Sequence, residues 1–383
     1  MSKTIDLVEK YVIKTYNRFQ VVIEKGEGVY VYDENDKKYL DFVGGIAVNA
    51  FGYGNQKFKE VLLSQINKNI LHCSNYYYNK PLSEVAELLS KRSCFSHSFF
   101  CNSGTEANEL ALKLIKKYGN NNKKNKIIAF NKSFHGRTIG SLAITGQAKY
   151  RKDFEPLIPD IIFADFNDIE SVKKLVDDKV AGIILEPIQG EGGIYPSQKE
   201  FLKEIRNICN VNGIILVFDE VQCGIGRTGN LFAYQTFGVE PDIISLGKGI
   251  GNGFPVGVLA VKEKFSNILV AGDHGSTFGG NPFAMTCIKF VLENLNDDVL
   301  NNVKQVSKYF VEKLKKLPVK EVRGEGLMLG IEIEKSALEV ELKCIEKGLL
   351  VAGAGANVIR FVPPLVIEKE HVDECIEILS SVL

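Results

Sequence analysis

The sequence predicts an α/β protein whose main sheet is mostly parallel, and two observations along the chain support that fold class. Short apolar runs rich in β-branched residues recur through the middle of the chain, at residues 126–130, 180–185, 213–218, 242–245 and 255–261. Stretches with the apolar spacing of amphipathic helices, residues 105–118 and 199–212, lie between several of them. Apolar strands that alternate with amphipathic helices are typical of a parallel sheet covered by helices on both faces.

Three regions of the chain differ in their pattern. Residues 1–50 include VYVYDENDKKYLDF, whose alternation predicts a hairpin. Residues 51–285 carry the alternating strands and helices and predict a large ligand-binding domain of mixed, mostly parallel sheet. Residues 286–383 change to two helices and two strand-like runs, at 299–314, 336–347, 327–333 and 358–362. We therefore expect a smaller C-terminal α+β domain, with the N-terminal segment packed beside it.

Composition and charge argue against several classes of protein. The 383 residues favour at least two domains. Lysine plus arginine balance aspartate plus glutamate, 47 each, so we expect neither nucleic acid nor a membrane as a partner. No apolar run is long enough to span a bilayer and the N-terminus has no signal core, which predicts a cytoplasmic protein. The eight cysteines form no C-x-x-C pair and the five histidines lack metal-ligand spacing, so we expect no metal.

Polar residues follow three of the predicted strands, where parallel sheets bind their ligands. Ser103, Gly104 and Thr105 follow the strand-like residues 98–101 and open the helix that begins near residue 105. A helix N-terminus offers N–H groups and a favourable dipole to a phosphate. An ordinary helix cap is the alternative. Asp219 and Glu220 close an apolar strand, and alternation lets only one of them face a ligand. A structural salt bridge is the alternative for this pair.

Lys248 follows the apolar run 242–245 and stands among the glycines of SLGKGIGNGFPVG. Burial disfavours the ammonium form, so a lysine in such a place supplies a neutral, nucleophilic amine. A lysine that reaches solvent from a loop is the alternative. A phosphate cradle, a carboxylate for a pyridine nitrogen and an amine for an aldehyde are together what pyridoxal phosphate requires.

The chain resembles the class III pyridoxal-phosphate-dependent aminotransferases, and its motifs are most similar to those of the acetylornithine-type enzymes. The matching stretches occur in family order: FCNSGTEANELALKL (100–114), SFHGRTIGSLAITG (133–146), LEPIQGEGG (185–193), LVFDEVQCGIGRTG (216–229), PDIISLGKGIGNGFPVG (241–257), HGSTFGGNPFA (274–284) and VIRFVPPL (358–365). The resemblance implies the fold-type I transferase fold, pyridoxal 5'-phosphate as cofactor, amino and keto acids as substrates, and a homodimer with shared active sites.

The resemblance also implies roles for individual residues. Lys248 is expected to bond the cofactor aldehyde and to shuttle a proton, while Asp219 pairs with the ring nitrogen. The implied cofactor-binding set is Ser103, Gly104, Thr105, Phe134, Asp219, Glu220, Val221, Gln222, Lys248 and, from the neighbouring subunit, Thr277. The implied substrate-binding set is Arg137, Ser276, Glu191, Arg360 and Tyr16. Arg360 is expected to bind the α-carboxylate of glutamate, and Glu191 to neutralise Arg360 when the other substrate is bound.

The implied reaction is transfer of the δ-amino group of N-acetylornithine to 2-oxoglutarate in arginine biosynthesis. Ornithine, 4-aminobutyrate, succinylornithine and N-succinyl-diaminopimelate remain alternative amines. Ornithine enzymes carry tyrosine where this chain has Ile46, and an apolar residue suits an acylated substrate end better than a free ammonium. A nicotinamide dehydrogenase is a remote alternative because residues 224–229 fit G-x-G-x-x-G, but they do not directly follow a strand. An aminomutase of the same fold is less consistent with a Glu191–Arg360 pair.

Overall fold

The computed structural model describes residues 2–383, and its largest sheet has seven strands in the order β4-β12-β11-β10-β7-β5-β6. The strands are β4 (His97–Cys101), β5 (Lys126–Phe130), β6 (Ile161–Ala164), β7 (Val180–Leu185), β10 (Ile215–Asp219), β11 (Ile243–Leu246) and β12 (Gly257–Val261). Strands β11, β10, β7, β5 and β6 are parallel, while β12 runs antiparallel to both β11 and β4. The predicted mixed, mostly parallel sheet is confirmed.

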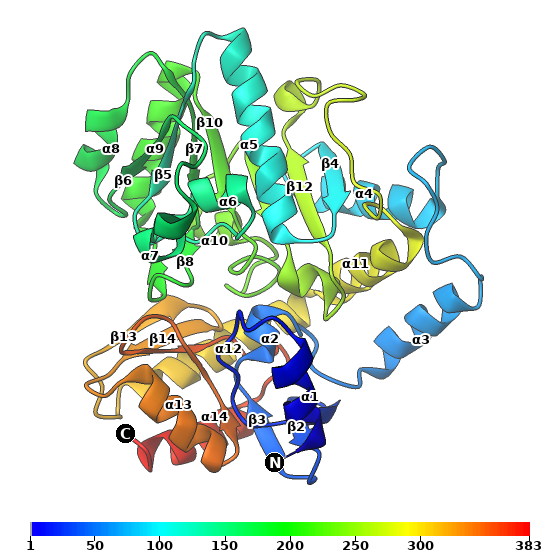
Figure 1. The fold of residues 1–383 in the computed structure, drawn as a ribbon, viewed down its shortest axis with the longest axis vertical. Helices are drawn as coiled ribbons and strands as arrows, with labels where there is room; N and C mark the ends of the chain where they lie inside the picture. Colours follow the sequence, from blue (N-terminus) through cyan, green and yellow to red (C-terminus); the bar gives the residue numbers. More distant parts are fainter. Residues whose placement is uncertain (1) are drawn as a thin grey trace.

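Both faces of this sheet are buried, as the apolar runs predict. Alternate residues of β10 belong to different apolar clusters, Ile215 and Val217 to one and Leu216 and Phe218 to the other. Helix α5 (Gly104–Asn121) shares the first cluster and α9 (Lys199–Asn212) the second, so the two helices cover opposite faces (Figure 1). The remaining helices of this large-sheet region are α3 (Gln56–Ile66), α4 (Lys80–Arg92), α6 (Ile139–Ala143), α7 (Ala148–Arg151), α8 (Ile169–Leu175), α10 (Ala233–Phe237) and α11 (Pro282–Asn294).

The rest of the chain forms a second part, called here the two-sheet region, which contains both ends of the chain in Figure 1. One sheet has the order β1-β2-β3-β15 and the other β13-β14-β17-β16. Their strands are β1 (Ile23–Glu27), β2 (Tyr30–Asp33), β3 (Lys38–Asp41), β13 (Glu321–Glu325), β14 (Met328–Glu332), β15 (Leu349–Leu350), β16 (Ala352–Gly353) and β17 (Val358–Phe361). The helices are α1 (Lys3–Tyr11), α2 (Gly44–Ala47), α12 (Asp297–Leu314), α13 (Ala337–Glu346) and α14 (Lys369–Ser380).

The N-terminal segment joins the C-terminal part through a strand pair. Strand β15 pairs in parallel with β3, at Leu349 with Leu40 and Leu350 with Asp41. The domain limits at residues 50 and 285 stay a prediction, and the second limit falls inside α11. That helix contacts α3 and α4 of the large-sheet region, so the chain passes towards the two-sheet region along a continuous helix rather than through a glycine-rich linker.

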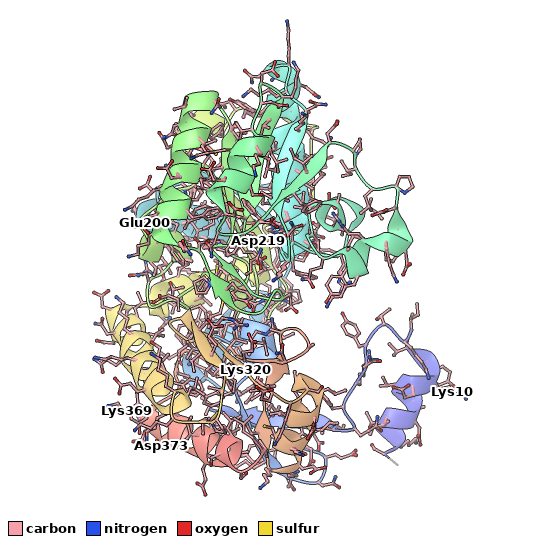
Figure 2. All side chains as sticks on the ribbon, turned by 90° about the vertical axis from the view of Figure 1, so that its left-hand side faces the viewer. Lys10, Glu200, Asp219, Lys320, Lys369 and Asp373 are labelled. Carbon is pink, nitrogen blue, oxygen red and sulfur yellow. The ribbon has the colours of Figure 1, made fainter. Side chains whose placement is uncertain are left out.

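The carboxyl ends of the central strands lie on the side of the sheet that faces the two-sheet region. Figure 2 labels Asp219, the last residue of β10, at that level of the molecule. In the parallel register Asp219 stands opposite Ser245 of β11, and the chain reaches Lys248 three residues later. Among residues 2–383 no helix is long and apolar enough to cross a bilayer.

Candidate active site

Lys248 lies directly beyond the end of β11, at the start of a short 3-10 turn, η2 (Lys248–Gly251). Its φ is 50°, a left-handed value that costs a non-glycine residue about 1–3 kcal/mol. The side chain is half-buried. Burial lowers the pKa of its amine, and the positive charge of Arg360 lowers it further. The negative charges of Glu191 and Asp219 raise that pKa, but the net shift is downward. Lys248 is therefore held in a place that favours the neutral amine.

Asp219 is buried at 3% exposure and is held by three donors. Its Oδ2 accepts Asn108 Nδ2–H at 2.8 Å and faces His135 Nδ1 at 2.7 Å, while Oδ1 accepts the N–H of Val221 at 3.0 Å. Within residues 2–383 no lysine or arginine forms a salt bridge with it. A carboxylate has about four acceptor positions, so one position remains for a further donor.

The side chain of Glu220 does not join this cluster, and the prediction that Glu220 binds the cofactor stays a prediction. Its carboxylate accepts the N–H groups of Ala233 and Tyr234, each at 2.6 Å, and so caps the start of α10. Burial raises its pKa to about 8. The reason is the alternation of side chains along the strand end, which sends Glu220 to the opposite side from Asp219.

The start of α5 forms a narrow cradle with the turn that precedes Lys248. Ser103 caps the helix by accepting the N–H of Glu106 at 3.3 Å, whereas Gly104 and Thr105 lie in the first turn, whose N–H groups have no acceptor within the helix. A Cβ on Gly104 would lie 2.6 Å from both γ-methyl carbons of Val221, and one on Gly247 would lie 3.3 Å from Gly104 N. Glycine at both positions lets these backbones approach closely.

Phe134 and Arg137 lie on the loop between β5 and α6. The N–H of Phe134 donates to Glu186 Oε2 at 3.0 Å, and the other oxygen of Glu186 accepts the N–H of Gly190 at 3.1 Å. The guanidinium of Arg137 stacks 3.8 Å from the ring centre of Tyr150 and 5.4 Å from that of Phe134. Arg137 is exposed and makes no salt bridge within the described residues, which leaves its donors free for a carboxylate.

Arg360 lies on β17 and is the residue that the two-sheet region contributes to this site. It is buried at 2% exposure, and its Nη1 donates to Glu191 Oε1 and, at 3.2 Å, to Gln222 Oε1. Burial raises the pKa of Glu191, but the charges of Arg360 and Lys248 outweigh that effect and the net shift is downward. Glu191 is therefore an anion that already occupies the arginine.

Four further residues singled out in the sequence lie outside these contacts. Ser276 Oγ accepts Asn102 Nδ2–H at 3.2 Å, close to the start of α5, while Thr277 beside it is exposed. Tyr16 is 73% exposed, and the guanidinium of Arg18 lies 5.4 Å from the centre of its ring. Ile46 is 37% exposed, with a φ of 64°.

Asn108, His135 and Glu186 belong to the cluster but were not predicted from the sequence. Asn108 is a polar residue within the apolar stripe of α5, buried at 1% exposure, and that interruption was a usable signal. His135 follows Phe134 directly, and Glu186 comes directly after β7. Their roles depend on contacts with Asp219 and with the loops, which no local pattern specifies.

These residues fit pyridoxal phosphate on two observations. The narrow cradle of Gly104, Val221 and Gly247 presents first-turn N–H groups, as a phosphate requires. Within residues 2–383 Asp219 has no lysine or arginine partner and keeps one acceptor position, as a protonated ring nitrogen requires. No group of three or more histidine, cysteine or acidic side chains that could hold a metal occurs in the part of the chain described.

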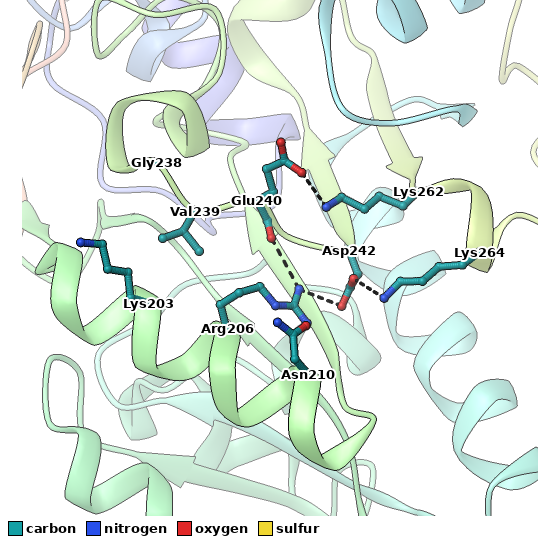
Figure 3. Close-up of a pocket in the computed structure, with 9 residues that line it drawn as sticks. All are labelled: Lys203, Arg206, Asn210, Gly238, Val239, Glu240, Asp242, Lys262 and Lys264. Atoms are coloured by element: carbon teal, nitrogen blue, oxygen red, sulfur yellow. Dashed lines mark hydrogen bonds and ion pairs between the residues drawn. The ribbon is translucent and has the colours of Figure 1, made fainter.

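A second polar hollow, of about 350 Å³, lies at the opposite end of β11 (Figure 3). It is lined by Lys203, Arg206, Asn210, Gly238, Val239, Glu240, Asp242, Lys262 and Lys264. Asp242 pairs with Arg206 and Lys264 at 3.0 Å each, and Glu240 pairs with Lys262 at 2.7 Å. Because most of its cations are neutralised by fixed acids, we regard this hollow as a structural ion-pair network.

Comparisons with known proteins agree with this geometry. The family described as Aminotransferase class-III matches residues 11–383. The acetylornithine aminotransferase of Aquifex aeolicus is 47% identical over 97% of this chain and 100% of its own length, and that of Clostridium acetobutylicum is 46% identical over 97% and 99%. A solved ornithine aminotransferase from Toxoplasma gondii has a TM-score of 0.94 at 29% identity, covering 99% of this chain and 93% of its own. The solved N-acetylornithine aminotransferase of Stenotrophomonas maltophilia has a TM-score of 0.85 at 34% identity, covering 99% and 98%.

Proposed function

The chain belongs to the class-III aminotransferase family, and we propose that it transfers the δ-amino group of N-acetylornithine to 2-oxoglutarate. The products are N-acetylglutamate semialdehyde and glutamate, and the place of the reaction is arginine biosynthesis in the cytoplasm. The observation that carries this proposal is the half-buried amine of Lys248 beside a paired arginine, Arg360, with an unpaired one, Arg137, on the adjoining loop. Such a site offers a nucleophile and two positions for carboxylates.

Class-III aminotransferases use pyridoxal phosphate, whose protonated ring withdraws electrons from the reacting carbon when it is bound. Gly104 and Thr105 would hold its phosphate, and Asp219 would keep the ring nitrogen protonated. Phe134 would pack on the face of the ring, and Gln222 would lie near its hydroxyl group. Lys248 would hold the cofactor through its aldehyde group, and its amine would serve as the base that moves a proton at the reacting carbon.

The Glu191–Arg360 pair lets one pocket accept two different substrates. N-acetylornithine presents a terminal amine far from its carboxylate, so nothing on it needs Arg360, and Glu191 keeps that charge neutralised. Glutamate carries a carboxylate beside its amine, which displaces Glu191 and binds Arg360. Arg137 binds the carboxylate that lies farther from the reacting amine in each case.

Ile46 supports an acylated amine rather than ornithine. Its side chain is apolar and partly exposed, and it offers no acceptor to the free α-ammonium of ornithine. The acetyl group of N-acetylornithine is uncharged and loses less hydration on contact with such a residue. N-succinyl-diaminopimelate meets the same condition, so both acylated amines belong in the test.

We also propose that the chain forms a homodimer with shared active sites. Tyr76, Tyr77 and Tyr78 are 93%, 71% and 105% exposed, and Phe278 is 59% exposed beside Thr277. Asn75 Nδ2 donates to Ser276 O at 2.9 Å, which ties the tyrosine segment to that loop. Large exposed apolar side chains on linked segments suit an interface between subunits, and Thr277 then reaches the phosphate of the partner's site.

Kinetics on the purified holoenzyme test the substrate assignment. N-acetylornithine, N-succinyl-diaminopimelate, ornithine and 4-aminobutyrate are each supplied with 2-oxoglutarate, and glutamate formation is followed. We expect the highest kcat/KM for N-acetylornithine and at least about tenfold less for ornithine, because the free ammonium meets Ile46. A higher kcat/KM for ornithine or 4-aminobutyrate would reject the proposal. Ile46→Tyr is the companion variant, and we expect it to narrow the gap for ornithine.

A further inference from the structure

Asn108 and His135 bind the side of Asp219 that faces away from the expected ring. Both donate to the same oxygen, Oδ2, at 2.8 and 2.7 Å. Asn108 Nδ2 also donates to the backbone oxygen of His135 at 2.8 Å, so both N–H bonds of its amide are used and the orientation of the amide is determined. All three side chains are at most 3% exposed. The carboxylate therefore has one rotamer with its donors in place.

The count of donors leaves Asp219 a single free position. Oδ2 is occupied twice and Oδ1 once, by the N–H of Val221, out of about four acceptor positions. Removing either side-chain donor would leave a buried anion short of a hydrogen bond, and such an anion takes up a proton more readily. A protonated Asp219 could no longer hold a proton on the ring nitrogen.

We propose that Asn108 and His135 are positioning residues for the aminotransferase reaction, which hold Asp219 ionised and aimed with one acceptor position open. The inference rests on the proposed function, since the group that fills that position is the cofactor ring nitrogen. Neither residue touches a substrate.

The charges around His135 support this role. Asp219 is its direct partner, and Glu186, whose carboxylate accepts the N–H of Phe134, acts on it from the end of β7. Burial lowers the pKa of His135, but Asp219 and Glu186 together raise it above its usual value. The raised pKa of His135 favours its protonated ring, whose Nδ1–H donates to Asp219, while burial raises the pKa of Glu186 to about 7.

Two substitutions at position 135 separate a donor role from a packing role. His135→Asn places an amide N–H close to where Nδ1 stood, whereas His135→Leu has similar bulk and no donor. We expect His135→Leu to lower kcat by roughly 10- to 100-fold, the value of a hydrogen bond to a charged group, with KM for N-acetylornithine nearly unchanged. We expect His135→Asn to restore most of the loss. Asn108→Leu should behave as His135→Leu does.

The visible absorption of the bound cofactor, titrated with pH, is the readout that a packing role would not move. In His135→Leu the pH midpoint of this absorption change should shift, because the proton is shared differently between the ring nitrogen and Asp219. The dissociation constant for pyridoxal phosphate should rise about tenfold. His135→Asn should keep the wild-type midpoint. An unshifted midpoint in His135→Leu with equal loss in both variants would overturn the proposal. If His135→Leu does not fold, the same comparison between Asn108→Leu and Asn108→Ser decides.

Tyr234→Phe is the matched control, because it removes one buried hydrogen bond, from Cys94 N–H at 3.2 Å, away from Asp219. It should keep wild-type kcat and midpoint. The wild-type protein separates this inference from the proposed function: if wild type binds pyridoxal phosphate but does not use N-acetylornithine, the proposed substrate fails, while the midpoints and dissociation constants of the variants still decide the roles of Asn108 and His135.

Discussion

Two buried aspartates at opposite ends of the central sheet are held in different ways. Asp242 stands at the amino end of β11, where Arg206 and Lys264 pair with its two oxygens and Leu216 N–H donates to it, each at 3.0 Å. Asp219 stands at the carboxyl end of the neighbouring β10 and has only an amide, an imidazole and one backbone N–H around it. Their exposures, 2% and 3%, are nearly the same.

The difference lies in what remains available to a ligand. A buried carboxylate must be compensated, and two cations with a backbone donor do this completely for Asp242. Asp219 also has three donors, but none of them belongs to a lysine or an arginine, so its charge is less fully compensated within the chain. Burial alone therefore does not identify a site, whereas the charge of the partners does. Lysines follow the same division, because Lys264 pairs with Asp242 while Lys248 makes no salt bridge within residues 2–383.

Replacing the two lysines should give the largest contrast. We expect Lys248→Ala to lower kcat by at least about 10,000-fold, because it removes both the nucleophile and a proton carrier, and proton transfer alone contributes about 100- to 10,000-fold. Lys264→Ala should stay within about twofold of wild type, because its side chain is 60% exposed and far from the reaction. Steady-state kinetics on both variants check this. Comparable losses in the two would show that Lys248 has no special role.

The next contrast concerns the aspartate that is expected to face the ring. Asp219→Asn should lower kcat by about 100- to 1,000-fold, in line with the loss of one preorganised charge at a reacting group. The protein should remain folded, because no lysine or arginine loses its partner. Kinetics together with thermal unfolding measure both effects. A turnover close to that of wild type would remove Asp219 from the mechanism.

Much of this contrast could be predicted from the sequence. Runs such as 213–218 and 242–245 predict the parallel strands, and the polar residues that follow them predict which end of the sheet carries the site. The same rule could not separate Asp219 from Glu220, since two adjacent acids at a strand end differ only in the side to which the strand turns them. It also did not predict that Asp242 is a structural residue, because the side chains that pair with it, Arg206 and Lys264, come from α9 and from beyond β12.

The contacts of Asn108, Glu186 and Arg360 could not be predicted from local sequence patterns. Asn108 pairs with Asp219 at the end of β10, and Glu186 pairs with Phe134 and Gly190 on two loops whose paths depend on the packed sheet. Arg360 was found through resemblance alone, because an arginine within VIRFV predicts no particular partner. Pairing between distant segments is a property of the fold, which local periodicity does not contain.

Loss of the carboxylate at the other end of the sheet should affect stability and leave catalysis intact. In Asp242→Asn, Arg206 remains at 17% exposure without its partner, while Lys264 is well solvated. Breaking a fully buried pair costs about 3–5 kcal/mol, so with the solvent screening of Lys264 we expect about 2–3 kcal/mol. Urea unfolding measures it, and kcat should stay within about threefold. Glu240→Gln, at an exposed pair, should cost less than about 1 kcal/mol.

The smallest effect is expected from the arginine pair that has to open. Arg206–Asp242 and Arg360–Glu191 are both arginine–carboxylate pairs, but Glu191 is 24% exposed and can leave, whereas Asp242 is fixed. Glu191→Ala should raise kcat/KM for glutamate relative to N-acetylornithine by about tenfold, about 1.4 kcal/mol, because Arg360 is then permanently free. The two half-reactions, measured separately, give this ratio.

Glu321→Ala is the matched control for that experiment. It takes one carboxylate from Arg323, another largely buried arginine of the two-sheet region, which keeps Glu332 at 2.9 Å as its partner. Its ratio of half-reactions should equal that of wild type. A shift towards N-acetylornithine in Glu191→Ala would mean that Glu191 binds the glutamate half of the reaction instead of opposing it. The pair at the carboxyl end would then be as fixed as Arg206–Asp242.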